Sequence, residues 1–402
     1  MRFSHGPAHA MSDSETEEDP PENEGSPRGA TAASPPAVRR KSREEFINEA
    51  LTIQGFDDSV IPYVSKPQRE SSCSVYDAHW NQFVDFCDRR NWDPRLTNAQ
   101  RMCEYLVFLF DTDKAVNTIE TAHAALRSVL RHFGYPDKMP GLVKDCVNSL
   151  WKARPRERKL CTEWDINFVL DSFLKPPYVN AEDDDGDICL RLMTIKTAFL
   201  TAMACSRRKS EIHAFSRARG FFKAENKPSG EVILSIHAIP KFTAKNQQAK
   251  NLYPQVNIRS IFHEHLDNPK EALLCPVRAI TRYVERTKDF PNPKNLLFVN
   301  PDKSKTATAS SLSCWLKAAI TTAYKQSGAS PHCNPHEIRA VSTSLSAFNH
   351  ASVSDIIEAG TWKNFSTFVD NYLRDVAPES GPGQPKYRLP SFIAAGTRIS
   401  DS

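Results

Sequence analysis

Apolar residues recur every three to four positions through the first half of the chain, after a polar start. This spacing is typical of amphipathic helices that bury one face. Asn98 precedes the second apolar stripe and is a suitable N-cap, while Asn117 and Thr118 open the third. The pattern predicts a compact domain of four helices. Its stripes are Tyr76, Trp80, Phe83, Val84 and Cys87; Met102, Tyr105, Leu106 and Leu109; Ala122, Leu126, Val129 and Leu130; and residues 142–151.

The second half of the chain mixes helical and strand patterns. Two short runs rich in β-branched residues, 231–236 and 253–258, predict strands on either side of a polar, lysine-rich turn at 241–246. The flanking sequence has helical spacing. We therefore expect a second domain that is mainly α, with a small antiparallel sheet inserted. Its predicted helices lie at 162–174, 188–205, 275–287 and 311–326, and helices occupy most of the remainder to Arg374.

Composition and proline placement suggest the domain limits. The start of the chain has few large apolar side chains, so it cannot offset its ordering entropy by burial, and we expect disorder there. A basic, proline-interrupted stretch at 152–159 suggests a linker. The resulting division is a disordered tail at 1–67, a helical domain at 68–155, a second domain at 160–376 and a C-terminal tail at 377–402.

The net charge of +4 understates how basic the folded part is, because an acidic run occupies 13–24. A basic excess suits a polyanionic partner. The ten cysteines form no CxxC pair and no Cys/His cluster with zinc-ligand spacing, so we expect no metal and no cofactor. The sequence lacks a signal-peptide core and an apolar run long enough to span a bilayer, so we expect no membrane association.

Four short motifs in the second domain form an ordered series. They are Arg208-Lys209-Ser210-Glu211, His336-Glu337-Ile338-Arg339, Gly360-Thr361-Trp362 and Phe368-Val369-Asp370-Asn371-Tyr372. In this order they resemble the tyrosine recombinase (phage integrase) family, over roughly residues 70 to 376. The Trp362 element looks closest to the branch encoded by DIRS-type eukaryotic retroelements. The resemblance implies a core-binding domain at 68–155 and a catalytic domain at 160–376.

The resemblance implies that Tyr372 is the nucleophile and that the product is a 3′-phosphotyrosyl link to DNA. Two arginines, Arg208 and Arg339, suit the negative charge that develops on the phosphate oxygens, because guanidinium groups can donate two hydrogen bonds each. Glu211, three residues after Arg208, can hold a basic group in place. His336 is a candidate for proton transfer. Trp362 stands where many relatives have histidine, and its indole N–H can only donate.

The family uses a lysine of the hairpin turn as the general acid for the leaving 5′-oxygen. Lys241, Lys245 and Lys250 are all candidates, and we favour Lys245 because it lies deeper in the turn. Two departures from the family pattern stand out. Ala340 occupies the place of a second histidine, and Ser206-Arg207 replaces Gly-Leu, which makes Arg207 a competitor for the role of Arg208.

Double-stranded DNA is the expected partner, bound by a tetramer that pairs two duplexes. The predicted DNA-binding residues are Arg127, Arg131, Lys152, Arg154, Arg156 and Lys241. A nuclear location follows from the eukaryotic origin that the resemblance implies, and the basic cluster at 39–43 suits an import signal or a DNA-backbone contact. Two alternatives stay open: a type IB topoisomerase-like activity, and a catalytically silent, domesticated DNA-binding protein.

Overall fold

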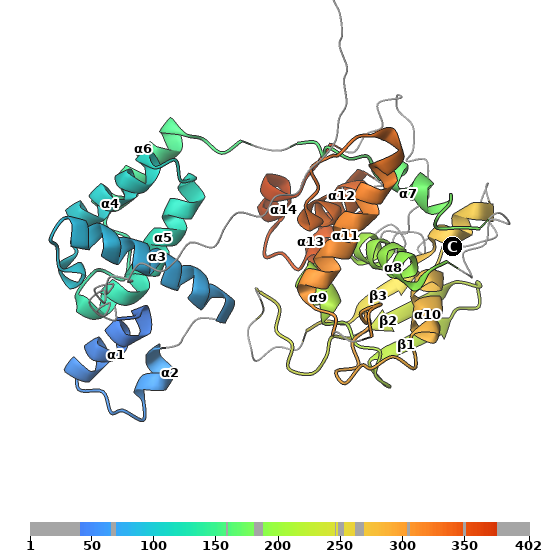
Figure 1. Ribbon diagram of the computed structural model, residues 1–402, viewed down its shortest axis with the longest axis horizontal. Helices are drawn as coiled ribbons and strands as arrows, with labels where there is room; N and C mark the ends of the chain where they lie inside the picture. Colours follow the sequence, from blue (N-terminus) through green and yellow to red (C-terminus); the bar gives the residue numbers. More distant parts are fainter. Residues whose placement is uncertain are drawn as a thin grey trace, which may run out of the picture. The chain divides into compact units, whose positions relative to one another are not determined.

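The computed structural model describes residues 41–65, 70–157, 160–180, 188–245, 247, 253–261, 269–303, 306–348 and 351–375. The chain divides after Arg156 into two compact units, Met1–Arg156 and Glu157–Ser402. Each unit has its own hydrophobic core. Figure 1 gives the element labels that are used from here on.

The first unit contains the four expected helices. Its core joins aromatic and aliphatic side chains, with Trp80, Phe83 and Tyr105 all fully buried. The Asn98 side chain accepts a hydrogen bond from the backbone N–H of Arg101, so the predicted N-cap is confirmed. The helices are α3 (Glu70–Arg89), α4 (Ala99–Asp111), α5 (Val116–Leu130) and α6 (Gly141–Ala153), with short 3₁₀ helices at Pro94–Leu96 and Arg131–Phe133.

The prediction of a disordered tail through residue 67 was wrong for its last part. Two helices, α1 (Arg43–Ile53) and α2 (Ile61–Ser65), form there, and Ile47 and Leu51 lie in the core of the first unit. A capping box begins α1, because Ser42 accepts from the Glu45 backbone while the Glu45 carboxylate accepts from the Ser42 backbone. Residues 1–40 lie outside the described residues.

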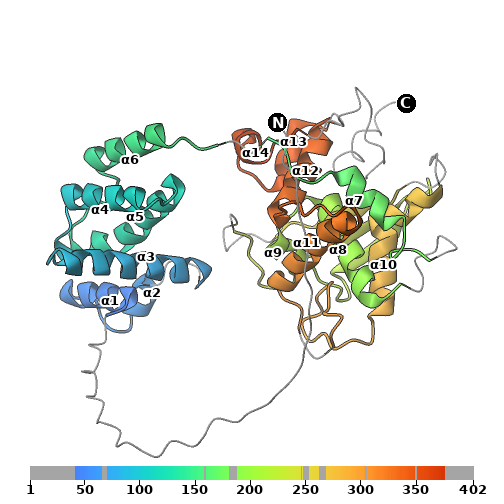
Figure 2. The same ribbon diagram turned by 45° about the horizontal axis from the view of Figure 1, so that its top comes forward.

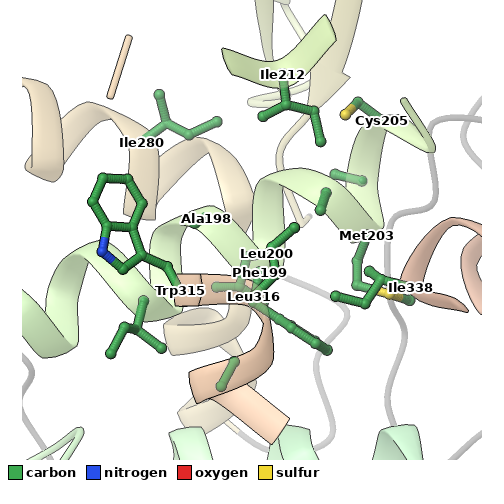
Figure 3. Close-up of a cluster of buried hydrophobic side chains, with 14 of the residues drawn as sticks. Ala198, Phe199, Leu200, Met203, Cys205, Ile212, Ile280, Trp315, Leu316 and Ile338 are labelled. Atoms are coloured by element: carbon green, nitrogen blue, oxygen red, sulfur yellow. The ribbon is translucent and has the colours of Figure 1, made fainter. Parts of the chain in front are cut away.

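The second unit is built around α8 (Leu190–Cys205), in which every residue from Met193 to Cys205 is buried. A helix that is buried on all sides forms the centre of a core rather than a surface layer. In Figure 2, α8 lies among the other helices of this unit. Figure 3 shows Phe199 and Leu200 in one cluster of buried side chains with residues of three other helices. They are Ile280 of α10 (Pro276–Arg286), Trp315 and Leu316 of α11 (Ala309–Tyr324) and Ile338 of α12 (Pro335–Phe348).

A three-stranded antiparallel sheet with the order β1-β2-β3 packs onto this helical core. Leu234 and Ile236 of β2, and Val256 and Ile258 of β3, are buried, while β1 is mostly exposed. The strands are β1 (Phe222–Asn226), β2 (Val232–Ile236) and β3 (Val256–Arg259). The expected fold class, mainly α with a small antiparallel sheet in the second domain, is therefore confirmed.

Shorter elements complete the second unit and carry much of the site. They are α7 (Ile166–Phe173), α9 (Lys209–His213), a 3₁₀ helix (Pro269–Leu274), another 3₁₀ helix (Lys325–Ser327), α13 (Val353–Gly360) and α14 (Phe365–Asn371). The predicted helix start at residue 162 was too early, because Asp165 is the N-cap of α7. The predicted end of the folded domain at 376 lies just outside the described residues.

Candidate active site

The end of α8 places the first arginine. Ser206 ends α8 in the left-handed conformation, with φ 51°, and the chain then turns into α9 with Arg208 as its N-cap. Arg208 Nη1 donates to Glu211 Oε1 at 2.9 Å, and the Arg208 backbone N–H donates to Glu211 Oε2 at 3.1 Å. The Glu211 side chain is fully buried and that of Arg208 is 12% exposed. This buried carboxylate therefore holds the Arg208 side chain, as the sequence suggested.

Arg339 lies on α12 and is almost fully buried. Its Nη2 donates to the Gly360 carbonyl oxygen, whereas Nε and Nη1 have no hydrogen-bond partner among the described residues. Burial, and then the positive charge of Arg208, lower the pKa of Arg339 to about 10. Buried donors without partners cost free energy unless a ligand satisfies them. Arg339 thus has two nitrogen donors without a partner among the described residues, and the charge of a second guanidinium, Arg208, acts on it.

Trp362 and Tyr372 lie against Arg339. The Arg339 guanidinium carbon is 4.8 Å from the centroid of the Trp362 ring and 5.1 Å from that of the Tyr372 ring. The two rings are 4.7 Å apart, and Phe368 packs behind Trp362. The buried Trp362 indole N–H has no partner among the described residues. The site therefore combines a third unpaired donor with a half-buried tyrosine.

Backbone contacts fix both aromatic residues. The Trp362 N–H donates to the Ile357 carbonyl oxygen at 3.0 Å, which folds the chain back over the end of α13. The Ser344 hydroxyl on α12 donates to the Tyr372 carbonyl oxygen at 3.2 Å and accepts from the Arg374 N–H at 2.8 Å. These bonds connect the end of α14 to the helix that carries Arg339.

His336 is exposed, one helical turn before Arg339 on α12. Partial desolvation and the positive charges around the ring lower its pKa, so the imidazole is neutral at pH 7 and can accept a proton. Lys245 and Lys241 are both exposed, and the charge of Lys245 is close enough to His336 to lower the pKa of the imidazole. Lys250 lies outside the described residues. The charges that lower the pKa of His336 include those of Lys209, Arg339, Arg208 and Lys245.

The six residues predicted for catalysis are thus connected in two ways. Arg339, Trp362 and Tyr372 are in direct contact, and the charges of Arg208, Arg339 and Lys245 act on the pKa of His336. They are Arg208, Lys245, His336, Arg339, Trp362 and Tyr372. The predicted DNA-binding residues Arg131, Lys152, Arg156 and Lys241 are exposed, and Arg127 is partly exposed.

Arg154, another predicted DNA contact, has partners within the first unit. Its guanidinium carbon is 4.1 Å from the Phe110 ring centroid, and its side chain donates to the Lys114 carbonyl oxygen and pairs with Asp113.

Two residues that sequence reasoning did not assign, Thr361 and Tyr253, also belong to the site, together with Arg207, which the sequence offered as a competitor for the role of Arg208. Thr361 accepts from Arg208 Nη1 at 3.4 Å and thereby joins α9 to the Trp362 element. Tyr253 donates to Glu211, and Arg207 lies over the Tyr253 ring. Thr361 lies inside a motif that the sequence analysis singled out, whereas nothing local in the sequence indicates the contact between Arg207 and Tyr253.

Within the described ranges, no three His, Cys, Asp or Glu side chains gather closely enough to hold a metal ion. Across the same part of the chain, every helix is too short or too polar to span a bilayer.

Comparison with known proteins was informative only at the level of structure. No protein-family model matches the chain, and no curated relative matches it. The XerH site-specific recombinase, in a post-cleavage complex with palindromic difH substrate, is similar with a TM-score of 0.53 at 12% identity. The match covers 83% of this chain and 91% of that chain. The Tn1549 transposon integrase, in complex with transposon right end DNA, has a TM-score of 0.52 at 11% identity, covering 84% and 96%. The chain therefore has the fold of the tyrosine recombinases.

Proposed function

We propose that this protein is a tyrosine recombinase that cleaves and rejoins double-stranded DNA through Tyr372. One observation carries the proposal. The buried side chains of Arg339 and Trp362 carry three nitrogen donors without a partner among the described residues, Nε, Nη1 and Nε1. The Arg339 guanidinium lies against the Trp362 and Tyr372 rings, and the charge of Arg208 acts on it. Donors of this kind suit an anion, and a phosphodiester has oxygens that can accept from all of them.

In the proposed reaction the Tyr372 hydroxyl oxygen attacks phosphorus and the bond from phosphorus to the 5′-oxygen breaks. The products are a 3′-phosphotyrosyl link and a free 5′-hydroxyl. Arg208, Arg339 and Trp362 bind the non-bridging oxygens and stabilise the charge that builds on them. Rejoining is the reverse reaction, in which the 5′-hydroxyl attacks the phosphotyrosine, so no external energy source is required.

Two proton transfers accompany the attack. His336, which is neutral because desolvation and nearby cations lower its pKa, accepts the proton of the Tyr372 hydroxyl. Lys245 donates a proton to the leaving 5′-oxygen. The influence of Lys245 on the pKa of His336 supports its role as the general acid. Proton transfer by a positioned side chain contributes about 10²–10⁴-fold to the rate.

The biological setting is a further part of the proposal. Integration and recombination of a mobile element of DIRS type, in the nucleus, is the role that the sequence resemblance supports. Assembly into a tetramer on DNA follows from the reaction, since exchange between two duplexes requires four cleavages. Arg43 of the basic cluster pairs with Asp77 and is almost buried, so an import signal would have to depend on the residues before it.

Covalent trapping tests the proposed chemistry. The full-length protein is incubated in EDTA with a pool of randomised duplexes that carry a nick, so that the cleaved end diffuses away and rejoining is blocked. After denaturation we expect DNA linked to the protein, lost in Tyr372→Phe and kept in Tyr63→Phe, a matched change at a residue that is 85% exposed. Sequencing of the captured DNA then yields a defined substrate.

The same assay separates the alternatives. No linked DNA, with duplex binding intact, would support a silent DNA-binding protein. Linked DNA that leads to relaxation of supercoils, but never to exchange between two sites, would support a topoisomerase.

A further inference from the structure

Arg207 lies directly before the arginine of the first motif and is 4% exposed. Its guanidinium carbon is 5.6 Å from the centroid of the Tyr253 ring. Its Nε and Nη1 have no hydrogen-bond partner among the described residues. A guanidinium over an aromatic ring is attracted by the negative face of the ring quadrupole, and the attraction is strongest where water is excluded.

Tyr253 connects this arginine to the site. Its hydroxyl donates to Glu211 Oε2 at 3.3 Å, the same oxygen that accepts from the Arg208 backbone. Burial raises the pKa of Tyr253, so the hydroxyl keeps its proton and remains a donor. Phe242 packs edge-on against the ring at 5.3 Å and restricts its rotation. Arg208 thus donates to both Glu211 oxygens, and Tyr253 adds a second donor to Oε2.

Charge explains why this carboxylate needs a second partner. The positive charges of Arg208 and Arg207 lower the pKa of Arg339, while Glu211 raises it. Three guanidinium groups and one buried carboxylate thus lie close enough for the charges of Arg207, Arg208 and Glu211 to act on Arg339. A small rotation of Glu211 would release Arg208 and leave buried charges without compensation, which is costly at low dielectric.

We propose that Arg207 and Tyr253 are positioning residues that fix Glu211 and, through it, the Arg208 guanidinium at the scissile phosphate. This inference rests on the proposed function and adds two residues to it. Arg207 holds the Tyr253 ring, the Tyr253 hydroxyl holds Glu211, and Glu211 holds Arg208. The Leu that stands at the position of Arg207 in the family pattern could pack on the ring but could not add positive charge beside the carboxylate.

The test uses the full-length protein and the substrate recovered by trapping. Tyr253→Phe removes one hydroxyl and keeps the ring beneath Arg207. We expect the cleavage rate at saturating DNA to fall about tenfold, the equivalent of about 1.4 kcal/mol, while duplex affinity stays within about twofold. Tyr283→Phe is the matched control. It removes another buried hydroxyl of this unit, which donates to the Val299 carbonyl oxygen at 2.9 Å, and should lower stability without slowing cleavage.

A double-mutant cycle distinguishes positioning from general stabilisation. If the hydroxyl acts through Glu211, then Tyr253→Phe slows wild-type cleavage but adds little to the effect of Glu211→Gln. Arg207→Lys should retain more of the cleavage rate than Arg207→Leu, because it keeps the charge. The inference would be overturned if the two substitutions had additive effects, or if Tyr253→Phe cleaved DNA at the wild-type rate. The proposed function would survive either result, as long as the wild-type protein still links to DNA through Tyr372. A wild-type chain that links to no DNA would overturn the proposed function itself.

Discussion

Gly360 is a position where a single methyl group should disturb the site without breaking any of its bonds. A Cβ atom built on Gly360 would lie 2.3 Å from Cε3 of the Trp362 ring and 2.5 Å from two further ring atoms. Carbon atoms in contact are about 3.5 Å apart, so Gly360→Ala requires a shift of about 1.2 Å. Gly360 is the last residue of α13 and its carbonyl oxygen accepts from Arg339. The shift therefore occurs beside both Arg339 and the ring of Tyr372.

This shift should affect both the stability of the protein and its cleavage rate. Overpacking of this kind typically costs about 1–3 kcal/mol of stability. A misplacement of about 1 Å in a catalytic group costs about a hundredfold in rate. We therefore expect Gly360→Ala to remain folded and to bind duplex DNA, but to form the covalent Tyr372 link about a hundredfold more slowly.

The assay is single-turnover cleavage of a nicked substrate, with urea unfolding measured in parallel. Gly141→Ala is the control, because a Cβ atom there meets nothing within 4 Å and the residue begins α6. That variant should cleave at the wild-type rate. If Gly360→Ala also did so, the Trp362 ring would not need its present place for catalysis, and the reasoning about the site would be refuted.

Other variants test other parts of the account. Glu211→Gln breaks the buried ion pair with Arg208, so the free energy of unfolding measured in urea should fall by about 3–5 kcal/mol. A fall of less than about 1 kcal/mol would contradict the claim that Glu211 and Arg208 form a buried ion pair. Burial lowers the pKa of His123 to about 4, so the unfolded chain binds more protons below about pH 6.5. Stability should then fall by about 3 kcal/mol between about pH 6.5 and about pH 4, and His123→Gln should flatten that part of the pH profile. Lys245→Ala should slow cleavage by about a hundredfold or more, yet leave a substrate with a 5′-sulfur leaving group unaffected, because a thiolate leaves without a proton. At saturating DNA, Lys241→Ala should slow cleavage of neither substrate, because the predicted role of Lys241 is to bind DNA. An equal loss of rate on both substrates for Lys245→Ala would exclude Lys245 as the general acid.

Local patterns in the sequence predicted the helical core well. The apolar run of α8 and the β-branched run of β2 each determine one element by themselves, and both were predicted close to their observed ends. β1 was not predicted, because its residues are mostly polar and exposed, so no alternation distinguishes them from a loop. The helix α1 was missed although Ser42 and Glu45 form the Ser-x-x-Glu pattern of a capping box.

The candidate site was predictable only where residues belong to a motif. Arg208 and Glu211 are three positions apart, and a helix brings them together wherever the chain folds. Tyr253 reaches Glu211 from 42 positions away. Such a contact depends on how the segment before β3 folds against α9, and no local spacing in the sequence encodes it. Arg154 is a second example of a contact that local spacing does not encode. The basic linker predicted that Arg154 binds DNA, whereas in the structure its side chain contacts Phe110 and Asp113.

The most direct measurement is to identify the amino acid that carries the DNA. The trapped complex is digested with nuclease and protease, and the peptide that retains a nucleotide is sequenced by mass spectrometry. The account predicts a 3′-nucleotide on the Tyr372 hydroxyl, in a peptide from the end of α14. A nucleotide on any other residue, or a trapped complex that persists in Tyr372→Phe, would contradict the central claim.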